Sequence, residues 1–482
     1  MAQAKVFNKR RSGILLHITS LPSGNLGTDA FKFIDFLCAS GSTVWQMLPL
    51  GPTHEDGSPY QCLSAHAGNN RFISRDILKS QAWAEPAKLN DTKMSRLMAT
   101  AYRQFIKNAT EADKQLFNEF CQEQQFWLDD YVLFREIRHL NQARAWFDWP
   151  VELRDRQPDA INKIKTERDE ALMIRRFEQY IFFCQWGQLR QYANANGVKL
   201  FGDMPIFVAH DSADVWAEPN LFTLDSQGVA TRVAGVPPDY FSETGQRWGN
   251  PLYEWQNHIQ QDFDWWKRRL KTQLQLFDLI RIDHFRGFES CWEIPASCET
   301  AIDGEWKPAP GEQLFDSLLA YFGELPLVAE DLGIITDEVT QLRERYGMPG
   351  MKILQFAFGG DASNPYLPHH QCEDSVTYTG THDNNTTLGW YHQLDEHTKK
   401  HVHAYFGETA ESMPWLFIRS ALRSVSELAV LPLQDVLSLD GKHRMNVPGT
   451  IEGNWLWQFN WDMFNSDNAN KLKALNILYG RC

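Results

Sequence analysis

The segment Asp278–Gly287, which reads DLIRIDHFRG, shows the pattern that decides the fold. It is a brief run of apolar and β-branched residues that ends in polar residues before a glycine, as buried strands do. Such near-continuous apolarity is typical of parallel strands that are covered on both faces. The chain repeats the pattern at Gly13–Pro22, Thr43–Gly51, Val198–Val208, Pro326–Gly333, Gly350–Phe358, Ser375–Asp383 and Val430–Val436. We therefore expect eight buried parallel strands.

Helical patterns lie between most of these expected strands. The clearest follows Pro326–Gly333 and reads DEVTQLRERYG, with Thr336 as its expected N-cap and Gly347 as the glycine that ends it. Repeated alternation of strand and helix predicts an α/β fold of the (β/α)8 TIM-barrel type. An open, doubly wound sheet is the competing architecture.

The spacing of the strands is uneven and predicts large helical insertions after the second and third strands. We expect residues 1–482 to form a single catalytic barrel, with a mainly helical insertion subdomain over residues 52–197. We expect residues 210–255 to form a loop-rich insertion carrying an active-site lid, because rings and polar groups interleave there. The alternative is a surface loop packed by its own rings. The residues concerned are Tyr240, Phe241, Trp248 and Tyr253, with Asp239, Glu243 and Gln246.

The composition limits which kinds of molecule the protein is expected to bind and where it is expected to act. With 61 acidic and 47 basic side chains, the formal net charge is −14, which disfavours nucleic acid and anionic membranes. The eight cysteines form no CxxC pair, and no stretch has the 18 or so apolar residues of a membrane span. We expect a cytoplasmic protein with reduced thiols, the alternative being a protein whose organelle transit peptide has been removed. The 18 Trp, 14 Tyr and 30 Phe suit either a large core or stacking on the C–H faces of sugars.

Catalytic groups of a barrel enzyme lie at the carboxyl ends of its strands. In DLIRIDHFRG, Arg281 and Asp283 are two residues apart and therefore share one face of the strand. A guanidinium favours the ionised form of a neighbouring carboxylate, which a carboxylate nucleophile requires. An interior salt bridge without chemistry is the other interpretation.

Two further expected strands end in acids. Glu330 follows an apolar run, where burial raises the pKa of a carboxyl group, so it could donate a proton; it could instead face the N-terminus of the next helix. Asp331 is expected to face the other way and either to cap a helix or to bond locally. Asp383 follows His382, and the pair could orient a sugar ring; a metal pair or an N-cap for the segment NNTTLGWY are the alternatives.

Taken together, the three acids fit retaining glycoside chemistry, in which two carboxyl groups about 5–5.5 Å apart act through a covalent sugar intermediate. The chain also resembles the amylomaltase/disproportionating-enzyme family of 4-α-glucanotransferases, glycoside hydrolase family 77. The matching motifs span nearly the whole chain: SPYQ at 58–61, FGDMPIFVA at 201–209, GVPPDYFSETGQRWGNPLY at 235–253, IRIDHFRGFESCWEIP at 280–295, VAEDLGIIT at 328–336, GTHDNNTT at 380–387 and RMNVPGT…NW at 444–455.

The resemblance implies a role for each matching residue. Asp283 matches the nucleophile, Glu330 the general acid/base, and Asp383 the third acid, which binds and distorts the sugar ring. The other implied substrate contacts are Arg281, His284, His382, Tyr60, Asp203, Asp239, Trp248 and Asn454. The implied reaction moves an α-1,4-glucan segment to the 4-hydroxyl of an acceptor glucan or glucose, with maltooligosaccharides and α-1,4-glucans as partners. The resemblance implies no cofactor and no metal.

Three other functions are compatible with parts of the sequence. An α-1,4-glucan hydrolase would share the acids and differ only in what attacks the sugar intermediate. A metal-dependent barrel hydrolase usually has an HxH pair after the first strand, where this chain reads His17-Ile18-Thr19. A glucan-binding protein without activity is the third, and the complete set of three acids argues against it.

Overall fold

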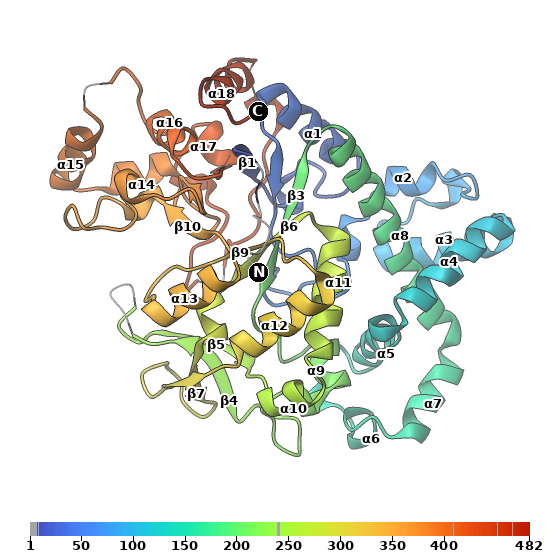
Figure 1. Ribbon diagram of the computed structural model, residues 1–482. Coiled ribbons are helices and arrows are strands. Elements are labelled where there is room, and N and C mark those ends of the chain that lie inside the picture. Colours follow the sequence, from blue (N-terminus) through green and yellow to red (C-terminus); the bar gives the residue numbers. More distant parts are fainter. Residues whose placement is uncertain (1–6, 8, 239–241, 408, 451, 465) are drawn as a thin grey trace.

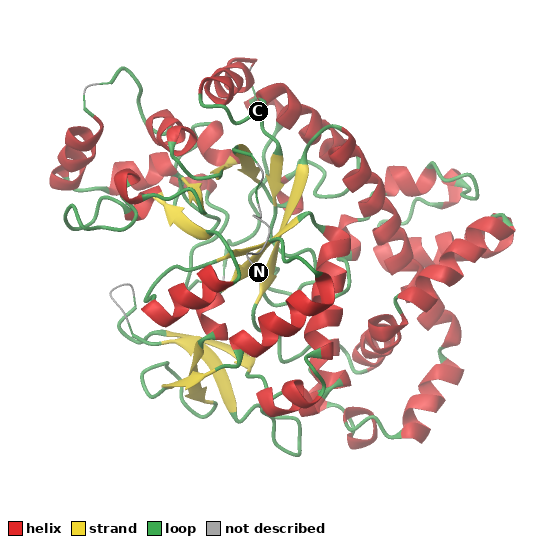
Figure 2. Ribbon diagram, viewed as in Figure 1, coloured by secondary structure: helices red, strands yellow, loops and turns green. Residues whose placement is uncertain are grey.

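The centre of the protein is a ring of eight parallel strands, surrounded by helices (Figures 1 and 2). The computed structural model describes residues 7, 9–238, 242–407, 409–450, 452–464 and 466–482. The strands are hydrogen-bonded in the order β10-β11-β12-β1-β2-β3-β6-β9. Their bounds are β1 Arg11–Leu15, β2 Val44–Gln46, β3 Lys199–Pro205, β6 Leu279–Asp283, β9 Leu327–Ala329, β10 Gly350–Ile353, β11 Ser375–Tyr378 and β12 Leu428–Pro432. Each lies in or overlaps one of the eight segments predicted from the sequence.

The ring closes between β9 and β10, which are the two ends of the hydrogen-bonded order. The backbone N–H of Ala329 donates to the carbonyl of Pro349 at 2.9 Å. Asp331 accepts a hydrogen bond from the N–H of Met351 on β10 at 2.7 Å, so its partner is 20 positions away and is not the local one that the sequence had predicted. The closed ring confirms the barrel and excludes the open, doubly wound sheet.

The inside of the barrel is filled by side chains and is not a pore. Apolar residues from successive strands meet there and are almost fully buried. They include Val44, Phe201, Leu279, Val328, Val376 and Val430. A filled interior leaves the carboxyl ends of the strands as the place where polar side chains can meet a ligand.

Helices follow most of the strands and cover the outside of the barrel (Figure 2). The one expected after Pro326–Gly333 is α13, which begins after Thr336, the predicted N-cap. Between β10 and β11 the fully described segment holds only the 3-10 turns Leu354–Phe356 and Pro368–His370. The helices outside the two inserted segments are α1 Thr28–Ser40, α12 Gly311–Phe322, α13 Asp337–Arg345, α14 Thr387–Gln393, α15 Glu396–Phe406, α16 Trp415–Arg423, α17 Leu433–Val436 and α18 Ser466–Leu478.

The long segment between β2 and β3 is largely helical and extends to one side of the barrel (Figure 1). Its last helix, α8, packs against α1, α11 and β3, and so joins the outlying helices to the barrel. Edge-to-face rings fill the space between the outer helices, among them Phe105, Phe117 and Phe177. The helices are α2 Arg75–Lys79, α3 Met94–Asn108, α4 Glu111–Glu123, α5 Gln125–Leu140, α6 Val151–Arg154, α7 Pro158–Glu167 and α8 Asp169–Ala195.

The segment after β3 contains strands as well as helices. Its helices are α9 Ala213–Ala217, α10 Trp255–Gln260 and α11 Asp264–Leu276. Its strands β4 Arg232–Val236 and β5 Gln246–Pro251 pair with two strands that follow β6, in the antiparallel order β5-β4-β7-β8. The sequence patterns did not predict β7 Ser290–Pro295 and β8 Glu305–Pro308, because both are short and partly exposed. This small sheet lies beside the barrel (Figure 2).

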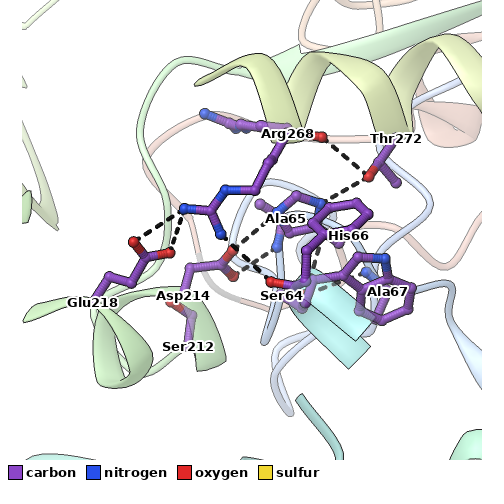
Figure 3. Close-up of polar contacts among 12 residues, drawn as sticks. Ser64, Ala65, His66, Ala67, Ser212, Asp214, Glu218, Arg268 and Thr272 are labelled. Carbon is purple, nitrogen blue, oxygen red and sulfur yellow. Dashed lines mark hydrogen bonds and ion pairs between the residues drawn. The ribbon is translucent and has the colours of Figure 1, made fainter. Parts of the chain in front are cut away.

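A sealed group of polar residues, here called the buried cluster, joins the chain after β2 to α9 and α11 (Figure 3). It consists of the backbone of Ala65 and the side chains of His66, Asp214 and Thr272. The N–H of Ala65 donates to Asp214 at 2.8 Å, and His66 Nδ1 lies 2.8 Å from Thr272 Oγ1. Nearby, Arg268 donates to both oxygens of Glu218 at 2.8 and 3.0 Å. These bonds fix the start of the long insertion against the barrel.

Two further observations concern the whole of the described chain. None of the described helices is both long enough and apolar enough to cross a membrane. All eight cysteines are free, with Cys291 buried and the others partly or fully exposed.

Candidate active site

A cleft of about 550 Å³ opens where the strands of the barrel end. Its walls come from the ends of β6, β9 and β11, from the antiparallel sheet, and from the loop that follows α17. The residues that line it include Tyr60, Trp248, Arg281, Asp283, His284, Glu330 and Asp383. The structure thus brings the three candidate acids into one cleft with four of the expected contact residues.

Asp283 is the last residue of β6 and is held by a charged pair below it. Arg281 Nη2 lies 2.9 Å from Asp283 Oδ1, so the two side chains share one face of the strand, as their spacing predicted. The same guanidinium donates through Nη1 to both oxygens of Asp203 on β3, at 2.7 and 2.8 Å. Arg281 and Asp203 are almost fully buried, whereas 30% of the Asp283 side chain is exposed. Asp283 therefore has one oxygen fixed by Arg281 and a second that can face a ligand.

Glu330 follows β9 and lies in the cleft, where the pKa of its carboxyl group is raised. Removal from water raises the pKa of Glu330 to about 8, and the charge of Asp283 adds to the rise, while Arg281 and the N–H of His284 oppose it. That N–H donates to Glu330 Oε2 at 2.7 Å. The donor is aimed by the left-handed backbone of His284, with φ 54° and ψ 52°. Glu330 is therefore mostly protonated at neutral pH, and its Oε1 is left for a ligand.

Asp383 lies across the cleft, in the loop that follows β11. Desolvation would raise the pKa of Asp383, but His382, Asn446 and Arg281 outweigh it and hold the pKa well below its usual value. Asn446 Nδ2 donates to Asp383 Oδ1 at 2.7 Å, and His382 Nε2 lies 3.3 Å from Asp383 Oδ2. The side chain is 47% exposed within the cleft, so this acid is both ionised and accessible.

Tyr60 links the Asp383 side of the cleft to the Arg281 side. Its hydroxyl donates to Asp203 Oδ2 at 2.7 Å and lies 2.9 Å from His382 Nε2. Its ring is stacked on His382, with centroids 5.2 Å apart. Neither Asp203 nor His382 lines the cleft. Both can therefore affect a ligand only through their contacts with residues that do line it.

The loop that carries His382 and Asp383 is tied at both ends by one buried carboxylate, Asp435. Its Oδ2 accepts from the hydroxyls of Thr379 and Thr387, each at 2.6 Å, and its Oδ1 accepts from the N–H of Thr387 at 2.7 Å. The helix that follows, α14, is capped by Thr386, whose hydroxyl accepts from the N–H of Gly389. The alternative that Asp383 caps this helix is therefore wrong.

The remaining expected contact residues fall into three groups. Trp248 on β5 meets the His284 ring edge-to-face, with centroids 4.8 Å apart, and both line the cleft. Asn454 does not line it: its side chain accepts from the N–H of Val447 and donates to the carbonyl of Thr450, which holds that loop in shape. Asp239 lies outside the described residues.

The sequence motifs contained two groups whose contacts were not predicted. Asn446 binds Asp383 directly, and Arg444 donates to the Asp383 carbonyl at 2.8 Å. Both belong to the quoted motif RMNVPGT, which was the only signal for them. In the described part of the chain, no group of three or more His, Cys, Asp or Glu side chains is arranged to hold a metal ion.

A (β/α)8 barrel that gathers three carboxylates and several rings in a cleft at the ends of its strands defines a class: barrel enzymes with a cleft suited to sugars. Comparison with known proteins gives the family. A family model described as 4-alpha-glucanotransferase, of glycoside hydrolase family 77, matches residues 16–463. The chain therefore belongs to the 4-α-glucanotransferase family.

Individual relatives cover the chain from end to end. The 4-alpha-glucanotransferase of Synechocystis is 45% identical, with 99% of each chain aligned. That of Thermus thermophilus is also 45% identical, over 97% of this chain and 98% of its own. Among solved structures, the amylomaltase of Streptococcus agalactiae in complex with acarbose superposes with a TM-score of 0.94 at 35% identity, over 98% of this chain and 100% of that one.

Proposed function

We propose that this chain cuts an α-1,4 bond in a glucan and transfers the severed segment to the 4-hydroxyl of a second glucan or of glucose. The observation that carries the residue roles is the pairing of Asp283, which Arg281 holds by one oxygen, with Glu330, whose pKa is raised to about 8. A nucleophilic carboxylate beside a protonated carboxyl group is what a retaining double displacement needs.

In the first step, Asp283 attacks the anomeric carbon through the oxygen that Arg281 leaves free. Glu330 gives its proton to the leaving 4-oxygen, so the bond between carbon and oxygen breaks as the ester to Asp283 forms. In the second step, Glu330 removes the proton from the acceptor 4-hydroxyl, which displaces Asp283. The product keeps the α configuration, and the enzyme returns to its starting state.

The residues around the acids are proposed to hold and distort the sugar at the cleavage site. Asp383 is ionised and accessible, and its two oxygens can accept from adjacent sugar hydroxyls. His382, Asp203 and Tyr60 fix the positions of the acids, because each bonds to a neighbour in the chain of contacts from Asp383 to Arg281.

Transfer requires that a sugar reach the ester before water does. Within the inserted residues 210–255, the hairpin formed by β4 and β5 is proposed to act as a lid over the cleft, since its described residues Val236, Gln246 and Trp248 line the cleft. A lid of this kind excludes water and keeps the acceptor close to the ester.

The substrates proposed are maltooligosaccharides and longer α-1,4-glucans, with neither cofactor nor metal, and with no part for nucleic acid or membranes. The net charge of −14 fits a neutral substrate better than a phosphate-bearing one. The place of action is proposed to be the cytoplasm, where the eight free thiols would stay reduced.

The test is to incubate the purified protein with maltotriose and to separate the products by length. A ladder of longer maltodextrins together with glucose is the expected result. Glucose and maltose without longer products would contradict transfer and indicate a hydrolase. No change with any maltooligosaccharide would contradict both and indicate a glucan-binding protein.

A further inference from the structure

We propose that Trp306 forms part of the binding site for the acceptor sugar, with Arg286 as the group that holds its ring in place. The inference rests on the proposed transfer reaction and adds to it a residue that sets how well a sugar competes with water. Neither side chain was among the contacts predicted from the sequence, because Trp306 comes from β8, a strand of the small antiparallel sheet.

The ring of Trp306 is fixed on two sides by protein. The Arg286 guanidinium carbon lies 3.7 Å from the centroid of the ring, which is a close cation–π contact. Trp292, its cross-strand partner on β7, meets it edge-to-face with centroids 5.3 Å apart. The ring is only partly buried, and Trp306 lines the cleft. An indole held in this way loses little side-chain entropy when a sugar stacks on it.

Arg286 is itself held in place by the loop that follows Glu330. It is 7% exposed, and Nη1 donates to the carbonyl of Ile334, in the loop after Glu330. Its Nε is buried and has no hydrogen-bond partner within the described structure. That Nε is shut off from solvent, so Arg286 acts through its contact with the indole. Arg286, Ile334 and Trp306 all line the cleft. The partly exposed indole is the group on which a sugar can stack, because one face of a sugar carries C–H groups.

The position of Trp306 and Arg286 in the cleft indicates which sugar unit they would bind. Arg286 follows β6 and its bond to Ile334 places it beside the loop that begins at Glu330, whereas Asp383 follows β11, two strands further round the ring from β9. In a retaining enzyme the acid/base group faces the leaving group and, later, the acceptor. The indole of Trp306, on the Glu330 side of the cleft, is therefore placed for the acceptor and not for the sugar hydroxyls that Asp383 would hold.

The molecule supplies a matched control. Trp292 belongs to the same ring pair and the same sheet, but it does not line the cleft, and its indole N–H is bonded to the carbonyl of Ala301 at 2.9 Å. Substitution of either tryptophan removes the same ring pair from the sheet. An effect that is seen only with Trp306 therefore reports on acceptor binding and not on the stability of the sheet.

The experiment uses maltohexaose as donor and radiolabelled glucose as acceptor. Label in longer products measures transfer, and new reducing ends measure hydrolysis, because transfer leaves their number unchanged. Trp306→Leu is expected to raise the KM for glucose about fivefold and to lower the ratio of transfer to hydrolysis by a similar factor, as the loss of one stacking contact would. Trp306→Phe is expected to keep most of the wild-type ratio, and Trp292→Leu to leave it unchanged.

Two results would overturn the inference: a glucose KM in Trp306→Leu equal to that of the wild type, or the same rise in Trp292→Leu. If Trp306→Leu does not fold, the comparison of Trp306→Phe with Trp306→His decides, since a smaller polar ring should raise the glucose KM. A wild-type protein that transfers no label at all would instead contradict the proposed function itself.

Discussion

Two groups of polar residues in this protein look alike in composition and differ in what they can do. The cleft cluster, here Asp203, Arg281, Asp283, Glu330 and Asp383, lies at the end of the barrel strands. The buried cluster around His66 and Asp214 connects α9 and α11 to the chain after β2 (Figure 3). Both contain buried carboxyl groups with displaced pKa values: burial raises the pKa of Glu330 to about 8 and that of Asp214 to about 6.

The two clusters differ in whether a ligand can reach their carboxyl groups and in whether those groups have an oxygen left to bind it. Asp214 is 8% exposed and gives one oxygen to the N–H of Ala65; the other lies 3.7 Å from His66 Nε2. Burial lowers the pKa of His66 to about 3, so the histidine is neutral and this contact is not an ion pair. In the cleft cluster, Asp283 and Glu330 each have one oxygen fixed and another left for a ligand, and Asp383, although it contacts Asn446 and His382, is 47% exposed. A displaced pKa therefore marks a functional group only where a ligand can reach it.

The largest effect expected is that of Asp283→Ala. Removing the nucleophile should lower kcat by about 10⁴-fold or more, because no other carboxylate can form the ester. Binding of maltooligosaccharides should persist, which isothermal titration can measure. In the buried cluster, Asp214→Asn should leave kcat within about threefold of the wild type. Similar losses in both variants would mean that the comparison between the clusters is wrong.

Glu330→Gln should come next, with a fall in kcat of about 10²- to 10⁴-fold on maltotriose, since the leaving oxygen is no longer protonated. With maltosyl fluoride as donor the first step should be affected much less, because fluoride leaves without a proton. Equal losses on both donors, measured by fluoride release and by product analysis, would contradict the role of Glu330 as an acid.

The pH dependence of the wild type should report the same group. Glu330 must be protonated in the free enzyme, and its pKa is about 8, so kcat/KM should be level near neutral pH and fall as the pH rises through about 8. The fall should be missing when maltosyl fluoride is the donor and the first step is followed. If kcat/KM falls in the same way at alkaline pH for both donors, the fall is due to the ionisation of a group other than Glu330, and the assignment is contradicted.

A smaller effect is expected from Asp435→Asn, which loosens the loop that carries Asp383. The amide has one acceptor oxygen where the carboxylate accepts three hydrogen bonds, from Thr379 and Thr387. We expect kcat/KM to fall by about tenfold, because Asp383 loses its exact position while remaining present. Asp440→Asn, a change in an exposed carboxylate of the next loop, is the control and should have no such effect.

The smallest effect on activity, and a clear one on stability, is expected from Asp214→Asn. The pKa of Asp214 is raised in the folded protein, so its ionisation disfavours folding: the cost appears as the pH rises above the unfolded value near 4 and is complete above about 6. The stability of Asp214→Asn relative to the wild type should thus increase by about 1 kcal/mol between pH 5 and pH 7. Urea unfolding at the two pH values measures this, and a difference that does not change with pH would contradict the expectation.

The sequence predicted those features of the fold and the site that depend on neighbouring residues. The two-residue spacing of Arg281 and Asp283 predicted a shared face, and the adjacency of Glu330 and Asp331 predicted opposite faces. Both follow from the geometry of a single strand. The eight barrel strands were found for the same reason, because each is a continuous apolar run.

What the sequence could not show depends on residues far apart in the chain. Asn446 meets Asp383 across 63 positions, and Asp435 reaches Thr379 across 56. The pairing of β4 with β7 joins segments on either side of a barrel strand, and β8, which carries Trp306, pairs with β7 in turn. Local patterns carry no information on such contacts, which arise only when the barrel closes.

The central claim, that a glycosyl ester forms on Asp283, is tested most directly by trapping that ester. Glu330→Gln is mixed with maltosyl fluoride, which can form the ester without an acid, while the variant lacks the base that would activate an acceptor. Intact mass followed by peptide mapping should show one maltosyl unit on the peptide that contains Asp283. No adduct, or an adduct on another carboxylate, would contradict the account.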